Sequence, residues 1–219
     1  MPCDPVPRAG LPVKKHGGGP GGWIEGDPFP VFASVECGPG GEFMAQAQGI
    51  ARARLEAGEQ CAVEKHVWGV LQAEGGRSIG TPDLARPLLH ALGEMDAWLA
   101  RERGGVGVIH VPAELVGFLS GPSPLVWDAA RGRVRTRLGS SVVFGACYDM
   151  RQRPDGKDAK PGEATVFVSG PLVVRRSPVQ SYDGLDRVTN DAAGVAERVY
   201  AVAVDCPAAW MTVKVSCAC

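Results

Sequence analysis

The sequence has no apolar stretch that approaches the roughly 18 residues a membrane-spanning helix needs. The opening residues, MPCDPVPRAGLPVKKHGGGPGG, lack a continuous apolar segment, so we expect no secretory signal. An excess of one charge is also missing, because 23 Lys and Arg stand against 24 Asp and Glu. Such a balance provides no bulk attraction to nucleic acid or to an anionic membrane. We therefore expect a protein that is made and assembled in a cytoplasm and has no membrane partner.

Motifs for nucleotide binding and nucleophilic catalysis are missing as well. The chain has no Gly-x-Ser-x-Gly elbow. The glycines of 104–107 follow an expected helix and precede an expected strand, whereas a dinucleotide fingerprint needs the strand first and the helix last. We accordingly expect no catalytic residue, no cofactor-binding residue and no cofactor.

Metal binding is not indicated either. Zinc sites need two suitably spaced ligand pairs, and the nearest candidates are Cys61 with His66 and Cys217 with Cys219. No second pair completes either set, so we expect no metal ligand. His110, at the end of an expected strand, is interpreted as a packed or hydrogen-bonded histidine.

Seven cysteines are present, and in a reducing compartment most of them should be free thiols. Free cysteines behave as small apolar residues. We expect this of Cys61, Cys147 and Cys206, whereas Cys3 and the pair at 217–219 lie near the termini, where they are more exposed.

Hydrophobic periodicity predicts an α+β protein with its helices early and most of its strands late. The helix expected at 82–103 has Thr81 as its N-cap and a stripe of five residues, Leu84, Leu88, Leu92, Met95 and Leu99. The other expected elements are a long helix at 42–68, a short helix at 112–119, strands at 29–37, 106–111, 134–144 (a pair around Gly139), 164–168, 172–176, 194–205 and 208–215, and loops at 70–81, 149–163 and 182–193.

Five blocks of sequence, in the same order, resemble one known family. They are FPVFASVECGPGGEFMAQAQGIARARLEAGEQCAVEKHVW (29–68), GGVGVIHVP (104–112), LGSSVVFG (138–145), ATVFVSGPLVVRRS (164–177) and NDAAGVAERVYAVAVDCPAAWMTVKV (190–215). The first looks like a short strand that leads into a long spine helix, and the last like two closing strands around a Cys-Pro turn. The set resembles the HK97-fold major capsid protein of tailed bacteriophages, in the form found in actinobacteriophages.

The resemblance implies an HK97-like capsid fold with a long spine helix, a peripheral (P) lobe and an axial (A) lobe. Residues 1–28, rich in Gly and Pro, would form an N-terminal arm. Residues 29–105 would contain the strand, the spine helix and the P-domain helix. Residues 106–177 would form the A domain, and residues 178–219 would return to the P domain with the C-terminal strands.

The function implied is structural and not enzymatic. Copies of the chain would assemble into pentamers and hexamers of an icosahedral phage head that encloses double-stranded DNA, in a virion assembled in the cytoplasm of a bacterial host. The implied partners are the chain itself, portal and scaffold or decoration proteins, and packaged DNA without sequence-specific contacts. Some shells of this family crosslink a lysine to an asparagine, but we interpret Asn190 as a residue that shapes a turn.

Three alternatives stay open. An encapsulin-like nanocompartment shell would have the same fold and would hold a protein cargo. A small cytosolic enzyme would depend on Cys or His, and a tail or head-completion protein would form a single ring.

The arginines at 131, 133, 135 and 137 alternate along the sequence, so on a strand they would share one face. This face would contact an acidic neighbour or phosphate, or it would be a solvated edge.

Overall fold

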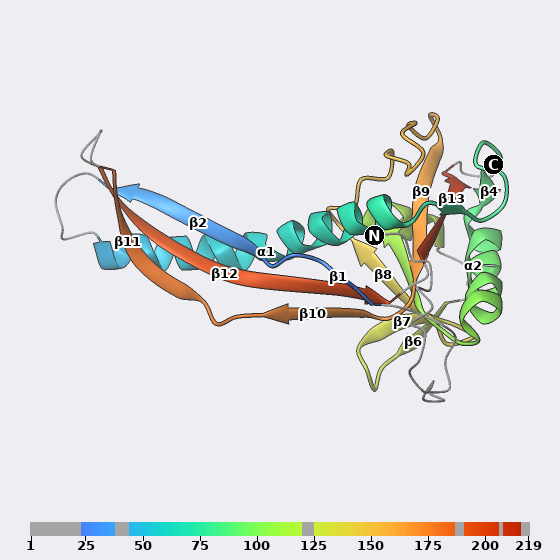
Figure 1. Ribbon diagram of the computed structural model, residues 1–219, viewed down its shortest axis with the longest axis horizontal. Helices are drawn as coiled ribbons and strands as arrows, with labels where there is room; N and C mark the ends of the chain where they lie inside the picture. Colours follow the sequence, from blue (N-terminus) through green and yellow to red (C-terminus); the bar gives the residue numbers. More distant parts are fainter. Residues whose placement is uncertain (1–22, 38–43, 120–124, 187–190, 206–207, 216–219) are drawn as a thin grey trace, which may run out of the picture. The chain divides into compact units, whose positions relative to one another are not determined.

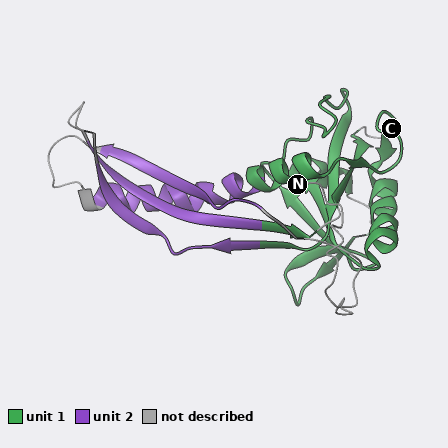
Figure 2. Cartoon of the chain, viewed as in Figure 1, with its two compact units in different colours: residues 1–24, 65–173, 203–219 green, residues 25–64, 174–202 purple. Residues whose placement is uncertain are grey.

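A computed structural model describes residues 23–37, 44–119, 125–186, 191–205 and 208–215. The described chain is α+β, as expected, with two α-helices and two β-sheets (Figure 1). It divides into two compact units (Figure 2): unit 1 comprises residues 1–24, 65–173 and 203–219, and unit 2 comprises residues 25–64 and 174–202.

Sheet A has five strands, with β12 at its centre. Its strands are β1 (Trp23–Glu25), β2 (Phe29–Cys37), β10 (Leu172–Arg176), β11 (Gln180–Asp186) and β12 (Asp191–Asp205). Both β2 and β11 run antiparallel to β12 in a continuous register. Backbone hydrogen bonds thus bring segments from opposite ends of the chain together.

Helix α1 (Met44–Glu74) covers one face of this sheet within unit 2. Ala51 and Leu55 pack against Ala196 of β12, and apolar residues of β2 and Val179 surround them. Side chains alternate between the faces of a strand, so even-numbered residues of β12 face the helix and odd-numbered residues face away. Unit 2 therefore has a narrow core on one side of its sheet.

Gly194 lets this helix approach the sheet. A Cβ atom at this position would lie 2.6 Å from the backbone nitrogen of Gln48 and 2.7 Å from the carbonyl carbon of Ala47. A Cβ atom on Gly49 or Gly58 of α1 would meet nothing within 4 Å, so the close approach of helix and sheet depends on the glycine of the strand.

Sheet B, in unit 1, has eight strands in the order β3-β13-β9-β5-β8-β7-β6, with β4 also paired to β13. The strands are β3 (Arg77–Ser78), β4 (Arg86–Pro87), β5 (Val108–Pro112), β6 (Leu125–Asp128), β7 (Arg133–Thr136), β8 (Ser141–Gly145), β9 (Glu163–Ser169) and β13 (Ala208–Lys214).

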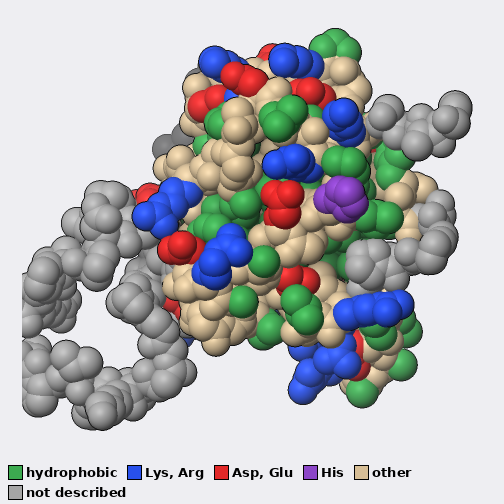
Figure 3. Space-filling view, turned by 90° about the vertical axis from the view of Figure 1, so that its right-hand side faces the viewer, with side chains coloured by type: hydrophobic (Ala, Val, Ile, Leu, Met, Phe, Trp, Pro, Cys, Tyr) green, Lys and Arg blue, Asp and Glu red, His purple; other side chains and the backbone are tan. Residues whose placement is uncertain are grey.

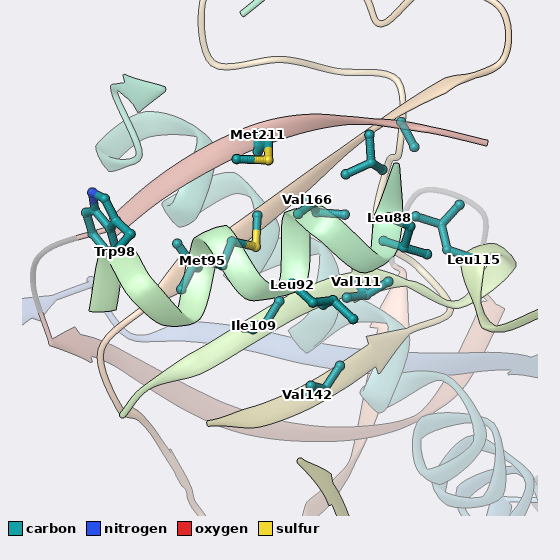
Figure 4. Packing of buried hydrophobic residues seen from close by; sticks show 14 of the residues in the cluster. Leu88, Leu92, Met95, Trp98, Ile109, Val111, Leu115, Val142, Val166 and Met211 are labelled. Atoms are coloured by element: carbon teal, nitrogen blue, oxygen red, sulfur yellow. The ribbon is translucent and has the colours of Figure 1, made fainter. Parts of the chain in front are cut away.

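Helix α2 (Leu88–Arg103) packs on one face of sheet B and forms the main core. Leu92 and Met95 lie against Ile109 of β5, Val166 of β9 and Met211 of β13 (Figure 4). A short 3-10 helix, Ala113–Leu119, adds Leu115 to the cluster. Four of the five expected stripe residues of this helix are buried, and the exception is Leu84.

The last turns of α1 contribute to the opposite face of sheet B. The Trp68 ring lies 4.6 Å from the ring of Tyr148 and 4.6 Å from that of Phe167 on β9. Leu71 is fully buried in the same region. Sheet B is thus packed on both faces, which explains the nearly continuous burial of β9 and β13.

The predicted start of the second helix is wrong, because α2 begins at Leu88 and not at Pro82. Pro87 has an extended backbone (φ −54°, ψ 136°) and belongs to β4, which pairs with β13. A proline also disfavours helical geometry at the residue before it. Thr81 therefore caps no helix, and Leu84 is exposed in the preceding turn.

The long helix continues past its predicted end at Trp68 to Glu74, so the expected loop at 70–81 begins at Gly75. A Cβ on Gly75 would collide with the Leu71 carbonyl oxygen at 2.3 Å, so glycine is needed at this helix end.

The predicted polar loop at 182–193 is also wrong, since 180–186 form β11 and β12 begins at Asp191. Strand β6 was not predicted. Helix α2 and β13 both belong to unit 1, in which β13 pairs with β9 along its length.

The remaining expected strands are confirmed with small shifts at their ends: β2, β5, the β7–β8 pair around Gly139, β9, β10, β12 and β13. The expected turn at Cys206-Pro207 and most of the expected N-terminal arm lie outside the described residues.

Replacement of Gly194 by alanine should loosen the contact between α1 and sheet A. We expect Gly194→Ala to lower the free energy of unfolding by about 2 kcal/mol, because the new methyl group meets backbone atoms that cannot move independently. Urea unfolding followed by circular dichroism measures the change. Gly184→Ala is the matched control, since its Cβ would have no neighbour closer than 3.7 Å. Equal stability of the two variants would contradict the role given to Gly194.

Candidate functional site

The candidate ligands are dispersed in the described part of the chain. No group of three or more His, Cys, Asp and Glu side chains there is arranged to hold a metal ion. His90 is exposed on α2, and burial lowers the pKa of His66. The helices of the described chain include none that is long and apolar enough to cross a membrane.

The cysteines depart from expectation. Cys61 and Cys147 are each disulfide-bonded, so the prediction that they are free thiols is wrong. Cys3, Cys206, Cys217 and Cys219 lie outside the described residues, as does Asn190.

His110 of β5 forms the one buried histidine network in the described chain. Its Nε2 lies 3.0 Å from Ser169 Oγ and its Nδ1 lies 3.3 Å from the Tyr148 hydroxyl. Ser169 Oγ donates to the Gly170 carbonyl, which fits a proton on Nε2. Complete burial lowers the pKa of His110 to about 3, so the ring is neutral at physiological pH. The expectation of a packed, hydrogen-bonded histidine is confirmed.

This His–Ser pair has the composition of a base and a nucleophile, but it is closed to substrates. His110 is 1% exposed and Ser169 is fully buried. A general base must reach a proton on the substrate or on a nucleophile in contact with it. In the observed conformation the pair can act only as a structural hydrogen-bond network.

Arg153 anchors the loop that sequence analysis placed at 149–163. It donates to Asp83 at 3.1 Å and to Asp155 at 3.1 Å, and its guanidinium lies 5.1 Å from the ring centre of Trp210. The Arg153 side chain is buried although most of its loop is exposed. Periodicity could not identify this residue, because its neighbours in sequence are polar surface residues.

Glu59 joins helix and sheet within unit 2. It accepts two hydrogen bonds from Arg198 of β12, at 3.0 and 3.1 Å, and one from the Tyr200 hydroxyl at 2.7 Å. Arg176 lies 3.6 Å away. Arg198, a charged residue inside an apolar strand, thus has a carboxylate partner on α1. Glu59 and its partners extend the small core of this unit.

The outer face of sheet A, which points away from α1, combines apolar side chains with charges of both signs. Arg176 of β10 lies near Glu59 on α1, so by alternation the exposed Arg175 points to the outer face. Phe32 of β2 is 66% exposed, and Tyr182 and Val199 are also exposed. Glu197 lies opposite Phe32 in the strand register and accepts a hydrogen bond from Tyr182 at 2.9 Å. Glu36 is exposed further along β2. In the described structure, no helix of unit 2 packs on this face.

The β6–β7 hairpin, residues 125–137, lies at one end of the strand order of sheet B in the described chain. Trp127 is 63% exposed, and Val126 is exposed on the other face of the hairpin. Figure 3 shows Lys and Arg side chains gathered at the height at which β6 and β7 lie in Figure 1, whereas acidic and basic side chains are interspersed above. Arg133 and Arg135 share one face of β7, as the alternation predicts.

Comparison with known proteins gives low similarity throughout. No protein-family model matches the chain, and no curated protein matches it. Solved structures similar to it include a chain of Mycobacterium phage Che8, at 16% identity over 80% of this chain and 66% of that chain, with a TM-score of 0.49. This chain therefore spans just under two thirds of the length of the Che8 chain.

Two further similar structures are described as an encapsulin complex and as part of a phage capsid. One is the holo-SrpI encapsulin complex of Synechococcus elongatus PCC 7942, at 13% identity over 87% of this chain and 75% of that chain, with a TM-score of 0.47. The other is the mature capsid of bacteriophage PhiM1, at 15% identity over 87% and 71%, with a TM-score of 0.41. With every TM-score below 0.5, no function follows from these similarities.

Acid should destabilise the protein through His110. Its pKa is about 3 in the folded state and 6.5 in a model peptide, so between these values the unfolded chain binds a proton that the folded chain does not. Stability is therefore complete above pH 6.5 and is lost as the pH falls toward 3, by up to about 1.4 kcal/mol per pH unit.

We expect His110→Gln to remove this contribution, which unfolding free energies measured between pH 4 and pH 7 would reveal. His90→Gln is the matched control, because His90 is exposed. The same pH slope in wild type and His110→Gln would disprove the assignment.

Loss of Arg153 should release the loop at 149–163. We expect Arg153→Met to lower the free energy of unfolding by about 2 kcal/mol, since two aspartates lose their partner and Trp210 loses a cation above its ring. Limited proteolysis should cut the loop faster in this variant. Arg151→Met, which alters an exposed arginine of the same loop, should behave as wild type.

Proposed function

We propose that the protein is a major capsid protein that self-assembles through pentamers and hexamers into the icosahedral head of a tailed bacteriophage. Its role is structural: copies of the chain form the wall that encloses double-stranded DNA. In this proposal the chain has no enzymatic activity, and its location is the virion. Portal and scaffold or decoration proteins are its further partners.

The observation that supports the proposal is the position of the secondary structure within the five blocks of capsid resemblance. Strand β2 leads into the long helix α1 as the first block implies, and β5 and β8 lie in the second and third. The pair β9 and β10 lies in the fourth block, and β12 and β13 lie in the last. A chance resemblance of apolar patterns would not be expected to match element type and order in every block.

The surfaces of the protein also suit assembly. The outer face of sheet A carries exposed apolar side chains, and sheet B ends, within the described chain, in a hairpin with an exposed tryptophan. A closed shell forms when each copy presents surfaces that repeat around symmetry axes, and many modest contacts then add up to a stable particle. Exposed apolar side chains on an otherwise charged surface are typical of such contacts.

An enzymatic role has less support. Within the described chain, the histidine–serine pair that resembles a catalytic arrangement is buried inside unit 1. The charged groups with the most contacts, around Glu59 and Arg153, are occupied in holding elements together. A net charge close to zero fits a capsid wall that encloses DNA, because it provides no strong electrostatic attraction to the phosphates.

Electron microscopy of the purified full chain tests the proposal. We expect negative staining after size-exclusion chromatography to show closed particles of uniform diameter, and mass photometry to give a mass that fits a whole number of copies. Single rings would instead favour a tail or head-completion protein. A monomer or dimer at every concentration and salt, also after co-expression with a scaffold, would contradict the proposal.

The contents of natural particles separate the two kinds of shell. Double-stranded DNA protected from nuclease would support a phage head. A protein cargo that stays with the particle through a density gradient would favour an encapsulin-like compartment.

A further inference from the structure

The β6–β7 hairpin concentrates positive charge that the rest of the chain lacks. Residues 125–137 contain four arginines, at 131, 133, 135 and 137, and a single acidic residue, Asp128. Because the whole chain has a net charge of −1, the remainder of the sequence is acidic overall. Figure 3 shows Lys and Arg side chains gathered at the height of this hairpin. An attraction to a polyanion would therefore be local to the hairpin and absent from the bulk of the surface.

Three of the arginines project from one face of the hairpin. Val134 of β7 packs against the main core that α2 covers. Side chains alternate along a strand, so Arg133 and Arg135, and Arg137 directly after the strand, face the opposite way. Trp127 is the register partner of Val134 and lies on the core side, although it is exposed. The arginine face is thus separate from the exposed tryptophan.

The positive charge of this face is compensated only in part. The Asp128 carboxylate lies 3.8 Å from the guanidinium of Arg131 and 3.6 Å from that of Arg135. Arg133 and Arg137 are exposed and have no ion-pair partner among the described residues. One carboxylate against four arginines leaves the hairpin with a net charge of +3. The arginines are therefore available to an anionic ligand.

The chemistry and spacing of the arginines suit the phosphates of a nucleic acid. A guanidinium binds a phosphate through two parallel N–H···O bonds and stays charged at physiological pH. Arg133 to Arg137 span roughly 13 Å of extended chain, at about 3.3 Å per residue. Over this distance one strand of duplex DNA presents about four phosphates. The row of side chains can therefore contact successive phosphates at once.

An acidic protein fits this face less well. The core of a protein interface is depleted of charged residues and rich in apolar ones. On the arginine face, the two strands of the described hairpin contribute a single exposed apolar side chain, Val126, which is the register partner of Arg135. A surface that consists mainly of separated arginines favours a ligand whose own charges repeat along a backbone.

We propose that the β6–β7 hairpin is a phosphate-binding surface for double-stranded DNA, with Arg133, Arg135 and Arg137 in contact with the DNA backbone. Such contacts read no sequence, because they go to phosphates and not to base edges. The inference rests on the proposed function, which places DNA beside the chain, and adds the residues that touch it. With two or three phosphates bound per copy, each contact is weak and depends on salt. Many copies would hold the DNA without fixing its position.

Salt-dependent binding to DNA tests the proposal. We expect fluorescence anisotropy of a labelled duplex of about 30 base pairs, titrated with the full chain, to give a slope of log affinity against log salt of about −2 to −3. Arg133→Gln and Arg137→Gln should each weaken binding about fivefold at roughly 0.15 M salt and reduce this slope by about one, equally on two unrelated sequences. Arg151→Gln, which alters an exposed arginine of the loop at 149–163, is the matched control and should bind as wild type.

Asp128→Asn tests the same surface in the opposite direction. It frees Arg131 and Arg135 from their shared carboxylate, so we expect binding to strengthen about fivefold and the salt slope to steepen. Trp127→Ser should leave DNA binding unchanged, because Trp127 lies on the other face of the hairpin. Circular dichroism confirms that each variant folds.

The outcomes separate this surface from the proposed capsid role. A salt slope near zero, or arginine variants that bind DNA like wild type, would overturn the phosphate-binding surface whether or not closed particles form. Arginine variants that bind DNA normally but fail to assemble would overturn it too, and would identify the hairpin as a protein contact. A chain that never assembles but binds DNA through these arginines would overturn the capsid role, and the phosphate-binding surface would stand.

Discussion

In the described structure, unit 2 buries only one face of its β-sheet, and its stability depends on the packing on that face. Helix α1 covers one side of sheet A, and the buried apolar cluster between them comprises Ala51, Leu55 and Ala196 with a fringe of partly buried neighbours. A sheet with so little core needs other support. Close approach at Gly194 and the carboxylate of Glu59 provide it, since both join the helix to β12 directly. In the described structure no helix of unit 2 packs on the face of sheet A that points away from α1, so this face is available to other molecules.

In unit 1, by contrast, both faces of the sheet are covered. Its sheet is packed by α2 on one face and by the end of α1 and the loop held by Arg153 on the other. Groups that might carry chemistry are absorbed into this packing: His110 is neutral and hydrogen-bonded, and Arg153 has two carboxylate partners. These groups stabilise the fold where they lie.

The proposed structural role would account for the exposed apolar side chains on the surface. An enzyme concentrates polar groups in a concave site, where their pKa values are tuned for reaction. Here His110, whose pKa is lowered to about 3 by burial, is out of reach of any substrate. Exposed Phe32 and Trp127 instead lie on the surfaces of two separate sheets. Such a distribution suits a subunit that recognises its own copies, with the strength of each contact limited and the number of contacts large.

The sequence by itself determined the α+β class, the stripe from Leu88 to Leu99 and most strands, because apolar periodicity is a property of neighbouring residues. It did not determine where α2 begins, since Pro87 is held in β4 by pairing with the distant strand β13. The sequence of β11 is polar and therefore did not predict a strand. Its pairing with β12 is made by backbone groups, which do not depend on side-chain character. The burial of Arg153 and the uncovered face of sheet A were decided only in the tertiary structure. Both depend on which segments meet across long separations in the chain, and local patterns do not encode that choice.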